Sequence, residues 1–458
     1  MALITSISGI RGTIGGAPGG ALTPVDIIRF TAAYAQYIRQ STPKRRYKVV
    51  VGRDARLSGE MVNRLVCGTL LSCGVDVVDA GLSTTPTVEM AVVWEGADGG
   101  IVLSASHNPR QWNALKLLNH LGEFLNASQS AQLLAYADRG DFYYAPVDQL
   151  GQYSQKEFTQ PHIEAVIAHP LVDVEAIYRR GYRVVLDAVN SVGGIIIPQL
   201  LENLGVCCVP LYCDPTGDFA HNPEPLPEHL TELSQLVVSE RADLGIAVDP
   251  DVDRLAFVCE EGTMFGEEYT LVAITDYLLS MRKGNVVSNL SSTRALTDTA
   301  AKHHCLRYTS AVGEVNVVEE MKLRQAVVGG EGNGGIIIPD LHYGRDALIG
   351  IALFLTHLAH EKISVSQLRE RYPTYYMVKE RMDIPSDFPL NAAFARIKQF
   401  YKNQTISELD GIKIDFEAEK RWGIVRASNT EPTLRIYTEA PTLYEAQSLA
   451  NDLILLLR

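Results

Sequence analysis

A serine at the end of an apolar run is the first residue of this sequence that could do chemistry. Ser106 lies in the segment Ser104–Pro109, which reads Ser-Ala-Ser-His-Asn-Pro and directly follows the run Gly100–Leu103. In open α/β sheets, ligands bind at the carboxyl ends of the strands, where loops present polar side chains. Ser106 is therefore either a polar loop residue or a nucleophile, and this segment alone favours neither.

Three aspartates spaced two residues apart give the strongest chemical signal. They are Asp249, Asp251 and Asp253. Clustered carboxylates repel one another unless protons or a cation offset their charge, and their oxygens suit a hard divalent ion such as Mg²⁺. An acidic surface turn is the alternative, but the triplet lies between two apolar strand patterns, Gly245–Val248 and Leu255–Val258. An EF-hand loop is a further alternative, although Arg254 stands where that loop requires glycine.

A second polar segment, near the end of the chain, could bind a phosphate group. Hydroxyls, an amide and backbone N–H groups beside an arginine suit a phosphate dianion, whereas an ordinary turn is the alternative explanation. The residues concerned are Arg426, Ser428, Asn429, Thr430 and Arg435.

The glycine-rich segment Gly329–Gly335 carries two polar side chains, Glu331 and Asn333. Its glycines allow the backbone to approach a ligand closely, and the two side chains could bind sugar hydroxyls. The segment is not a P-loop, because the Lys-Ser/Thr ending is missing. A flexible connection explains the same residues equally well.

Two isolated cations and one histidine complete the set of candidates. Arg11 lies between glycines, and Lys116 follows the serine segment by ten residues. Either could steady a transferring phosphoryl group or move a proton, and either could equally be a solvated surface cation. His107, next to Ser106, could act with it or simply brace its loop.

Short apolar strand patterns alternate with amphipathic helix patterns through most of the chain. This alternation predicts mixed or parallel sheets covered on both faces, in three related α/β domains followed by a smaller α+β domain. Polar clusters follow several of the strands, as expected for side chains that share one sheet edge. Strands are expected near 49–51, 75–78, 101–103, 183–187, 244–248, 285–290, 326–330, 411–416 and 423–426, and helices near 59–72, 347–359, 390–401 and 443–457.

Composition excludes several functional classes. A chain of 458 residues is too long for one core, and its net charge of −13 argues against binding to nucleic acid or to anionic membranes. No apolar run could span a bilayer, and Met1–Ser8 lacks the basic region and apolar core of a signal peptide. Seven cysteines without metal-site spacing are expected to be reduced, buried hydrophobes, so we expect a cytoplasmic protein.

Taken together, four of these segments resemble the α-D-phosphohexomutase superfamily, in the order in which that family has them. Ser104–Pro109 resembles its phosphoserine loop, and Asp249–Arg254 resembles its magnesium loop. Gly330 and Glu331 resemble the start of its sugar loop, and Arg426–Pro432 resembles its phosphate loop. Any one of these similarities could arise by chance, but four in order are highly specific.

The resemblance implies four domains around a central cleft. We assign them to residues 1–150 (phosphoserine loop), 151–255 (metal binding), 256–370 (sugar recognition) and 371–458 (phosphate binding). It also implies that Ser106 is phosphorylated and that Ser106 and the three aspartates bind Mg²⁺. Arg11, His107 and Lys116 match family positions near the transferring group, where acid and base roles are assigned, and Arg254 matches the arginine beside the metal loop.

The implied reaction is reversible phosphoryl transfer between the 6- and 1-positions of a hexose phosphate. It proceeds through phosphoserine and a sugar 1,6-bisphosphate, which is also the expected activator. The oligomeric state is open, with a homodimer as one candidate. Two other classes of function stay open: a Mg²⁺-dependent sugar phosphatase, and a non-catalytic protein that binds sugar phosphate or Ca²⁺.

Sequence details within the family favour glucosamine phosphate as the substrate. Gly9–Gly12, Val312–Glu314 and Arg435 resemble phosphoglucosamine mutases, whereas Asn429 resembles phosphomannomutase/phosphoglucomutases. Gly335 departs from both groups, which usually have histidine there, and Glu331 and Asn333 are the substrate-binding candidates of this loop.

Overall fold

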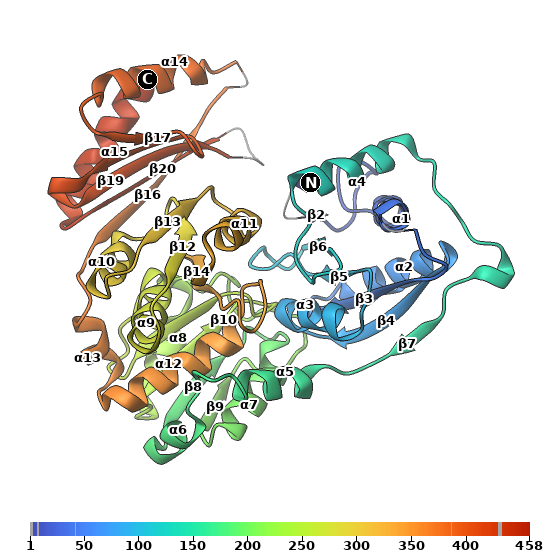
Figure 1. The fold of residues 1–458 in the computed structure, drawn as a ribbon, viewed down its shortest axis with the longest axis horizontal. Helices are drawn as coiled ribbons and strands as arrows, with labels where there is room; N and C mark the ends of the chain where they lie inside the picture. Colours follow the sequence, from blue (N-terminus) through green and yellow to red (C-terminus); the bar gives the residue numbers. More distant parts are fainter. Residues whose placement is uncertain (1–2, 7–8, 42, 386, 429–432) are drawn as a thin grey trace. The chain divides into compact units, whose positions relative to one another are not determined.

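The computed structural model describes residues 3–6, 9–41, 43–385, 387–428 and 433–458. The chain forms two compact units (Figure 1). The first consists of Met1–Thr270 and Asn333–Ser366, and the second of Leu271–Gly332 and Gln367–Arg458.

A seven-stranded mixed sheet begins the first unit, with strand order β1-β2-β6-β5-β3-β4-β7. The strands β3, β4, β5 and β7 pair in parallel, whereas β1, β2 and β6 add antiparallel pairs. The bounds are β1 (Leu3–Ser6), β2 (Gly9–Thr13), α1 (Pro24–Ser41), β3 (Tyr47–Arg53), α2 (Gly59–Ser72), β4 (Val75–Leu82), α3 (Thr85–Trp94), β5 (Gly99–Leu103), β6 (Trp112–Leu118), α4 (Ala127–Arg139), the 3₁₀ turn η1 (Val147–Gln149) and β7 (Tyr153–Gln155).

Helices cover both faces of this sheet, which explains why its central strands are apolar throughout. Val49 and Val51 of β3 pack in one core with residues of α1, α2 and α4, while Val50 packs on the other face with residues of α3. Successive side chains of a strand point to opposite faces, so a strand buried on both sides contains no alternating polar positions.

A second mixed sheet, of order β11-β10-β8-β9, also lies in the first unit. Strands β8, β9 and β10 are parallel, and β11 returns antiparallel to β10, which places the tight turn Asp249–Arg254 between two fully buried strands. The elements are α5 (Thr159–Ile167), α6 (Val174–Arg180), β8 (Arg183–Asp187), α7 (Gly193–Asn203), β9 (Cys207–Leu211), η2 (Pro227–His229), α8 (Thr231–Ser239), β10 (Leu244–Val248) and β11 (Leu255–Cys259). The first unit also contains α12 (Ala347–Glu361) and β15 (Gly335–Ile337), which is not a strand of this sheet.

The second unit contains three parallel strands of a four-stranded sheet, in the order β13-β12-β14, and an antiparallel sheet with the order β16-β20-β19-β18-β17. Helices α14 and α15 pack on the antiparallel sheet through Ile397, Leu449 and Leu453 (Figure 1). The elements are α9 (Glu267–Met281), β12 (Asn285–Asn289), α10 (Arg294–Lys302), β13 (Arg307–Ser310), α11 (Glu314–Arg324), β14 (Ala326–Glu331), α13 (Val365–Glu370), β16 (Tyr376–Asp383), α14 (Leu390–Phe400), β17 (Thr405–Ser407), β18 (Ile412–Phe416), η3 (Glu417–Glu419), β19 (Arg421–Ala427), β20 (Thr433–Ala440) and α15 (Leu443–Leu457).

The predicted fold class, α/β domains with mixed sheets followed by a smaller α+β domain, is confirmed. The four domain boundaries remain a proposal. Two strands on the far side of a proposed boundary pair with a strand of the preceding domain. Strand β7 joins the first sheet although it follows residue 150, and β11 pairs with β10 although all but its first residue follow residue 255. All seven cysteines are free, as expected, but the expectation of burial is confirmed only for Cys67, Cys73 and Cys259. Cys207 is exposed, and Cys208, Cys213 and Cys305 are only partly buried.

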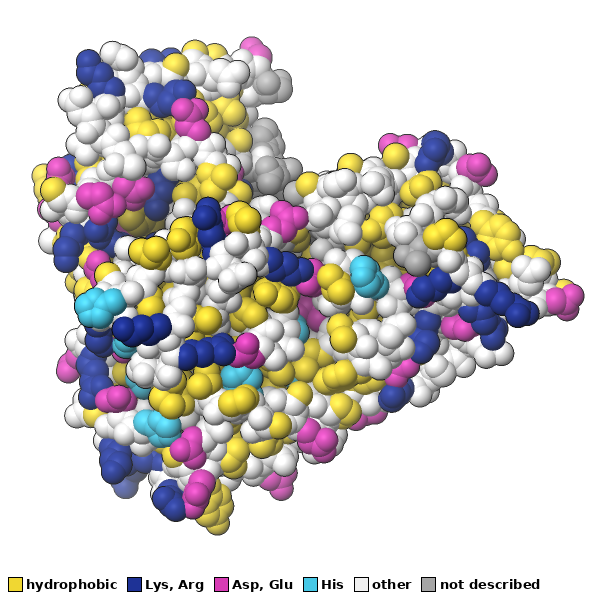
Figure 2. All heavy atoms as spheres, in the orientation of Figure 1, with side chains coloured by type: hydrophobic (Ala, Val, Ile, Leu, Met, Phe, Trp, Pro, Cys, Tyr) yellow, Lys and Arg dark blue, Asp and Glu magenta, His cyan; other side chains and the backbone are white. Residues whose placement is uncertain are grey.

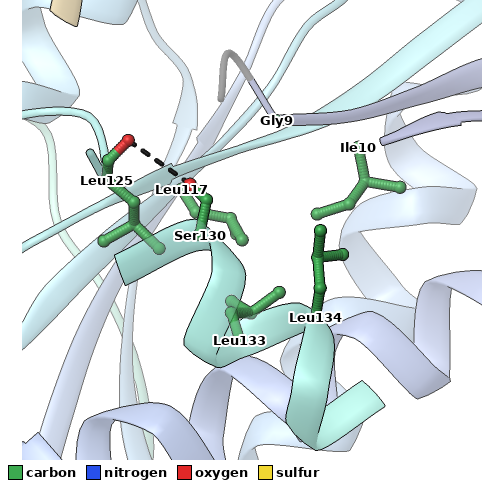
Figure 3. Close-up of a pocket in the computed structure, with 7 residues that line it drawn as sticks. All are labelled: Gly9, Ile10, Leu117, Leu125, Ser130, Leu133 and Leu134. Carbon is green, nitrogen blue, oxygen red and sulfur yellow. Dashed lines mark hydrogen bonds between the residues drawn. The ribbon is translucent and has the colours of Figure 1, made fainter. Parts of the chain in front are cut away.

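A small hollow lies between β2, β6 and α4 in the first unit (Figure 3). Its lining is almost entirely apolar, and the hydroxyl of Ser130 is already bonded to the carbonyl of Leu125 at 3.4 Å. We therefore interpret it as a packing gap rather than a binding site. The lining residues are Gly9, Ile10, Leu117, Leu125, Ser130, Leu133 and Leu134.

On the face drawn in Figure 2, acidic and basic side chains are interspersed rather than gathered in stripes of one sign. Among the described residues, no helix is long and apolar enough to cross a membrane.

Candidate active site

The serine loop between β5 and β6 holds Ser106 in a strained backbone conformation. Ser106 has a φ of 49°, a left-handed value that residues other than glycine rarely adopt. Its N–H donates to Oγ of Ser104 at 2.9 Å, and the Ser104 hydroxyl donates to the carboxylate of Asp54 at 2.7 Å. The loop is thus anchored to the end of β3, in the manner of functional loops that retain strain because their surroundings fix them.

Arg56 ties the same loop down from inside the protein. It is 1% exposed and forms an ion pair with Asp54, Nε to Oδ2 at 2.9 Å. Its guanidinium also donates to backbone carbonyls around the serine, those of Ser106, Asn108, Pro109 and Trp112. Arg56 is not among the residues predicted from the sequence, although its position two residues after Asp54, at the end of a buried strand, was an available signal.

The turn that carries the aspartate triplet is also strained. Oδ1 of Asp249 accepts the N–H groups of Asp253 and Arg254, each at 3.1 Å, which curls the backbone around that carboxylate. Val252 has a φ of 65° and is fully buried, an unusual state for a β-branched residue. The hydroxyl of Ser191 holds the turn from β8's loop by donating to the carbonyl of Pro250 at 2.7 Å.

The structure brings the serine loop and the aspartate turn together. The Ser106 hydroxyl donates to Oδ2 of Asp249 at 2.5 Å, and Nδ1 of His107 lies 3.4 Å from the same hydroxyl. Two segments that the sequence singled out separately therefore form one polar centre.

Basic side chains surround the other two aspartates. Nζ of Lys116, on β6, lies 2.6 Å from Oδ2 of Asp251 and 3.1 Å from Oδ2 of Asp253. Nη2 of Arg345 lies 2.8 Å from Oδ2 of Asp253. At the start of α3, Thr85 donates its N–H to the Asp251 carbonyl at 2.9 Å and its hydroxyl to the Asp251 carboxylate.

Two of the carboxylates each keep one oxygen that these contacts do not use as a hydrogen-bond acceptor. Oδ1 of Asp251 and Oδ1 of Asp253 are buried and accept no hydrogen bond from the described residues. The three aspartates offer ligand oxygens within 4.8 Å of one another. Buried, unpartnered carboxylate oxygens at that spacing suit a hard divalent cation, so the residues present fit Mg²⁺.

The charge at the aspartate cluster is balanced differently from what the sequence predicts. From the sequence we expect an external cation to offset three repelling carboxylates, but Lys116 and Arg345 already supply positive charge at the cluster. Burial and the two neighbouring aspartates raise the pKa of Asp249 well above its ordinary value. Although burial opposes the shift, Arg345 and Lys116 hold the pKa of Asp253 well below its ordinary value.

Three further candidates, His107, Arg11 and Arg254, lie around this centre. Burial and the charges of Arg254 and Arg11 lower the pKa of His107 well below its ordinary value. Burial and Arg254 likewise lower the pKa of Arg11, whose Nη1 donates to Oδ1 of Asn108 at 3.5 Å. Arg254 pairs with Glu224, Nη1 to Oε1 at 3.1 Å.

The candidates for binding the sugar and its phosphate lie mostly in the second unit. Glu331 ends β14, and its Oε1 accepts from Nδ2 of Asn289 at 2.9 Å and from the N–H of Gly313 at 3.1 Å. Nε of Arg426, on β19, lies 3.2 Å from Oδ2 of Asp410. Ser428 donates its N–H to the carbonyl of Thr433 at 2.9 Å.

The other three phosphate-loop candidates give less structural information. Arg435 is exposed on β20, where its Nη1 donates to the Tyr437 hydroxyl at 3.4 Å. Asn429 and Thr430 lie outside the described residues. Asn333, in the first unit, accepts the N–H of Gly335 at 3.2 Å, a local turn contact.

Comparison with known proteins accounts for all four parts of the chain. Family models match residues 3–144, 160–262 and 266–375 as α/β/α domains I, II and III of phosphoglucomutase/phosphomannomutase. A fourth matches residues 380–456 as the C-terminal domain of the same family.

Individual relatives extend over nearly the whole chain. A phosphoglucomutase/phosphomannomutase from Thermococcus kodakarensis is 34% identical over 95% of both chains. A phosphoglucosamine/phosphogalactosamine mutase from Sulfurisphaera tokodaii is 30% identical over 99% of this chain and 98% of its own. The crystal structure of a Burkholderia thailandensis phosphoglucomutase/phosphomannomutase family protein has the same fold, with a TM-score of 0.85 at 24% identity and coverage of 99% and 98%. The chain therefore belongs to the phosphoglucomutase/phosphomannomutase family, whose members are mutases, that is, isomerases that act as intramolecular phosphotransferases.

Proposed function

We propose that this mutase moves a phosphoryl group between the 6- and 1-positions of a hexosamine phosphate, with Ser106 as the phosphoryl carrier and glucosamine phosphate as the preferred substrate. The observation that carries the proposal is the hydrogen bond of 2.5 Å from Ser106 to Asp249, in a carboxylate cluster with two oxygens that accept no hydrogen bond within the described part of the chain. A hydrolytic serine would require a base held in place by a third group. Here the serine instead faces a carboxylate cluster suited to a cation, as phosphoryl transfer requires.

In the proposed reaction, phosphorylated Ser106 gives its phosphoryl group to a hydroxyl of the bound sugar monophosphate. The new bond joins phosphorus to the sugar oxygen, the bond between phosphorus and Oγ breaks, and the proton leaves the sugar hydroxyl while Oγ gains one. The sugar 1,6-bisphosphate then presents its other phosphate, and the same bond changes run in reverse. Because atoms and protons balance over the cycle, the reaction consumes no co-reactant.

The chain's own residues supply position and charge for this transfer. Arg56 and Ser104 fix the serine loop, and His107 lies 3.4 Å from Oγ, within reach to hold or move a proton. Lys116, Arg11 and Arg254 add positive charge beside the reacting oxygens, which favours a transition state that spreads negative charge. Mg²⁺, bound by Ser106 and the three aspartates, would neutralise further charge on the phosphoryl oxygens.

Recognition of the sugar and its second phosphate is proposed for the remaining candidates. We assign the sugar hydroxyls to Glu331 and Asn333, and the phosphate that stays on the sugar to the C-terminal loop. That loop contributes Arg426, Ser428, Asn429, Thr430 and Arg435. Glucosamine is favoured by the sequence details given above and by a relative named phosphoglucosamine/phosphogalactosamine mutase, whereas another is named phosphoglucomutase/phosphomannomutase.

The test is the conversion of 6-phosphates to 1-phosphates, followed by ³¹P NMR for glucosamine, glucose and mannose in parallel with Mg²⁺ and a trace of bisphosphate. We expect the highest kcat/KM for glucosamine, and we expect the Ser106→Ala variant to be inactive. The Ser130→Ala variant, in which the serine lies on α4, is the matched control and should be fully active. Intact mass should show a phosphoryl group on the purified wild type and none on Ser106→Ala.

Each alternative gives a different result in the same experiment. Full activity of Ser106→Ala would overturn the role of the serine, and a preference for glucose or mannose would overturn the choice of sugar. Release of inorganic phosphate without isomerisation would indicate a phosphatase. Binding without turnover would indicate a sugar-phosphate-binding protein.

A further inference from the structure

Arg345 enters the aspartate cluster from a part of the sequence that carried no catalytic candidate. It lies between β15 and α12, is 8% exposed, and its Nη2 lies 2.8 Å from Oδ2 of Asp253. That oxygen also accepts from Nζ of Lys116 at 3.1 Å, while Oδ1 of Asp253 is one of the two unpartnered oxygens. Two cationic donors on one oxygen fix the plane of a carboxylate and leave its other oxygen in a defined direction.

The absence of a side chain at Gly335 makes room for Arg345. A Cβ atom built at Gly335 would lie 2.3 Å from Cδ and 3.0 Å from Cγ of Arg345. Real Cβ atoms do not approach other carbons this closely, so any residue but glycine at 335 must push the arginine stem aside. The sequence has glycine at 335 where related proteins usually have histidine. In the structure, the side chain of Arg345 fills the space that a side chain at 335 would need.

Buried polar contacts hold the backbone after Arg345, and close packing surrounds the backbone before it. Asp346 donates its N–H to the carbonyl of Ile336 at 2.8 Å, and its carboxylate lies 2.9 Å from Nε2 of His162. Before the arginine, a Cβ atom at Gly344 would lie 1.8 Å from Oε2 of Glu89, so the chain passes directly against that buried side chain. Arg345 is thus pre-positioned by the fold rather than free to select another partner.

From this arrangement we infer that Arg345 is a positioning residue of the mutase reaction, that it orients Asp253 so that Oδ1 faces the cation site, and that Gly335 is required because it admits Arg345. The inference rests on the proposed function in one respect: it assumes that the aspartate cluster binds the cation that the reaction uses. It assigns no contact between Arg345 and the sugar.

The experiment compares Arg345→Met, Arg345→Lys, Gly335→Ala and the Gly335→Ala/Arg345→Met double variant with wild type. The probe is Mn²⁺ in the absence of sugar, with its Kd measured by electron paramagnetic resonance; kcat, KM and thermal unfolding are measured alongside. Arg179→Met, which removes an exposed arginine paired with Glu175 on α6, is the control and should match wild type.

We expect Arg345→Met to weaken Mn²⁺ binding and to lower kcat, each by roughly 10- to 100-fold, with little change in KM. Removal of a positive charge would by itself tighten binding of a cation, so weaker binding reports the lost orientation of Asp253. Arg345→Lys should recover part of both losses. Gly335→Ala should reproduce the defect, and the double variant should be no worse than either single variant, because both changes remove the same interaction.

Unchanged or tighter Mn²⁺ binding in Arg345→Met would overturn the inference, as would additive losses in the double variant. If Arg345→Met does not fold, the same criteria apply to Arg345→Lys and Gly335→Ala. If wild type fails to interconvert hexose phosphates, the proposed function fails while the Mn²⁺ measurements still decide the role of Arg345.

Discussion

The hydroxyl of Ser106 and Oδ2 of Asp249 are 2.5 Å apart, although 143 residues separate them in sequence. The other oxygen of Asp249 accepts the N–H groups of Asp253 and Arg254. Asp249 therefore links the serine loop to the backbone of the aspartate turn. A phosphoryl group on Ser106 would be placed next to the remaining carboxylates by this one residue.

The variant Asp249→Asn should separate the role of Asp249 in catalysis from its role in folding. Asparagine keeps Oδ1 as an acceptor for the two backbone N–H groups. Its NH₂ group, in the place of Oδ2, cannot accept a hydrogen bond from the serine hydroxyl, and the neutral side chain cannot supply a negative ligand. We expect kcat to fall on the order of 100-fold or more, the range seen when one preorganised electrostatic group is removed. Unfolding temperature without metal should be equal to or above that of wild type, because one buried carboxylate that repels its neighbours is gone.

The control for this variant is Asp138→Asn, at an exposed position on α4, which should leave both kcat and the unfolding temperature unchanged. Steady-state kinetics and scanning calorimetry check the two quantities. A variant that keeps wild-type kcat would show that Asp249 does not take part in the reaction.

Arg56 should affect both stability and catalysis. Arg56→Met removes the guanidinium from four carbonyls of the serine loop and leaves Asp54 charged and buried without its ion-pair partner. Breaking a buried pair on one side costs about 3–5 kcal/mol of unfolding free energy, and we expect a loss of that size in urea denaturation. Activity should fall as well, because the loop that holds Ser106 loses its main anchor.

The double variant Asp54→Asn/Arg56→Met separates the two effects. Removing both charges should recover part of the unfolding free energy but little of kcat, since the loop carbonyls still lack their donor. Equal recovery of both quantities would mean that Arg56 supports the fold alone.

The pair of His342 with two acids predicts a pH dependence of stability. Nε2 of His342 lies 3.3 Å from Oδ2 of Asp346, and Nδ1 lies 3.3 Å from Oε2 of Glu89. Although burial disfavours the charged ring, Asp346 and Glu89 raise the pKa of His342 to about 10 from 6.5. A raised pKa means that the folded state binds the proton more tightly. The stabilisation is complete below about pH 6.5 and is lost as pH rises through about 10.

The measurement is the unfolding free energy from pH 6 to pH 10 for wild type and His342→Gln. We expect the wild type to lose on the order of several kcal/mol more than the variant over this range. His120→Gln, at an exposed position, should keep the wild-type slope. Parallel curves for wild type and His342→Gln would show that the ring is not charged in the folded protein.

Local periodicity was sufficient to predict many elements of the fold. Helix α2 spans the predicted residues 59–72, and strands β8 and β10 match their predicted bounds, because each has one clear apolar pattern with polar or glycine residues at its ends. Strand order was not predictable. Strand β6 enters between β2 and β5 and runs antiparallel to both, a choice made by long-range packing that no local pattern records.

In the candidate site, too, some residues could be predicted from the sequence and others depend on long-range packing. Ser106, Lys116 and the aspartate triplet could be named from residue type, spacing and family resemblance. Arg56 and Arg345 were not named, because an arginine after a strand or before a helix is usually a surface residue. Their significance depends on which carbonyls and carboxylates they reach, and those groups are distant in the chain.

The sequence by itself determined the chemistry available to this protein: a serine at a strand end, three closely spaced carboxylates, and the family to which they belong. The tertiary structure decided how these groups are used. It paired Ser106 with Asp249, placed Lys116 and Arg345 on Asp253, and left Oδ1 of Asp251 and Asp253 without a hydrogen-bond partner among the residues that the structure describes. Residue type fixes which atoms can donate, accept or carry charge, but distance and burial fix which of them interact, and both are properties of the folded chain.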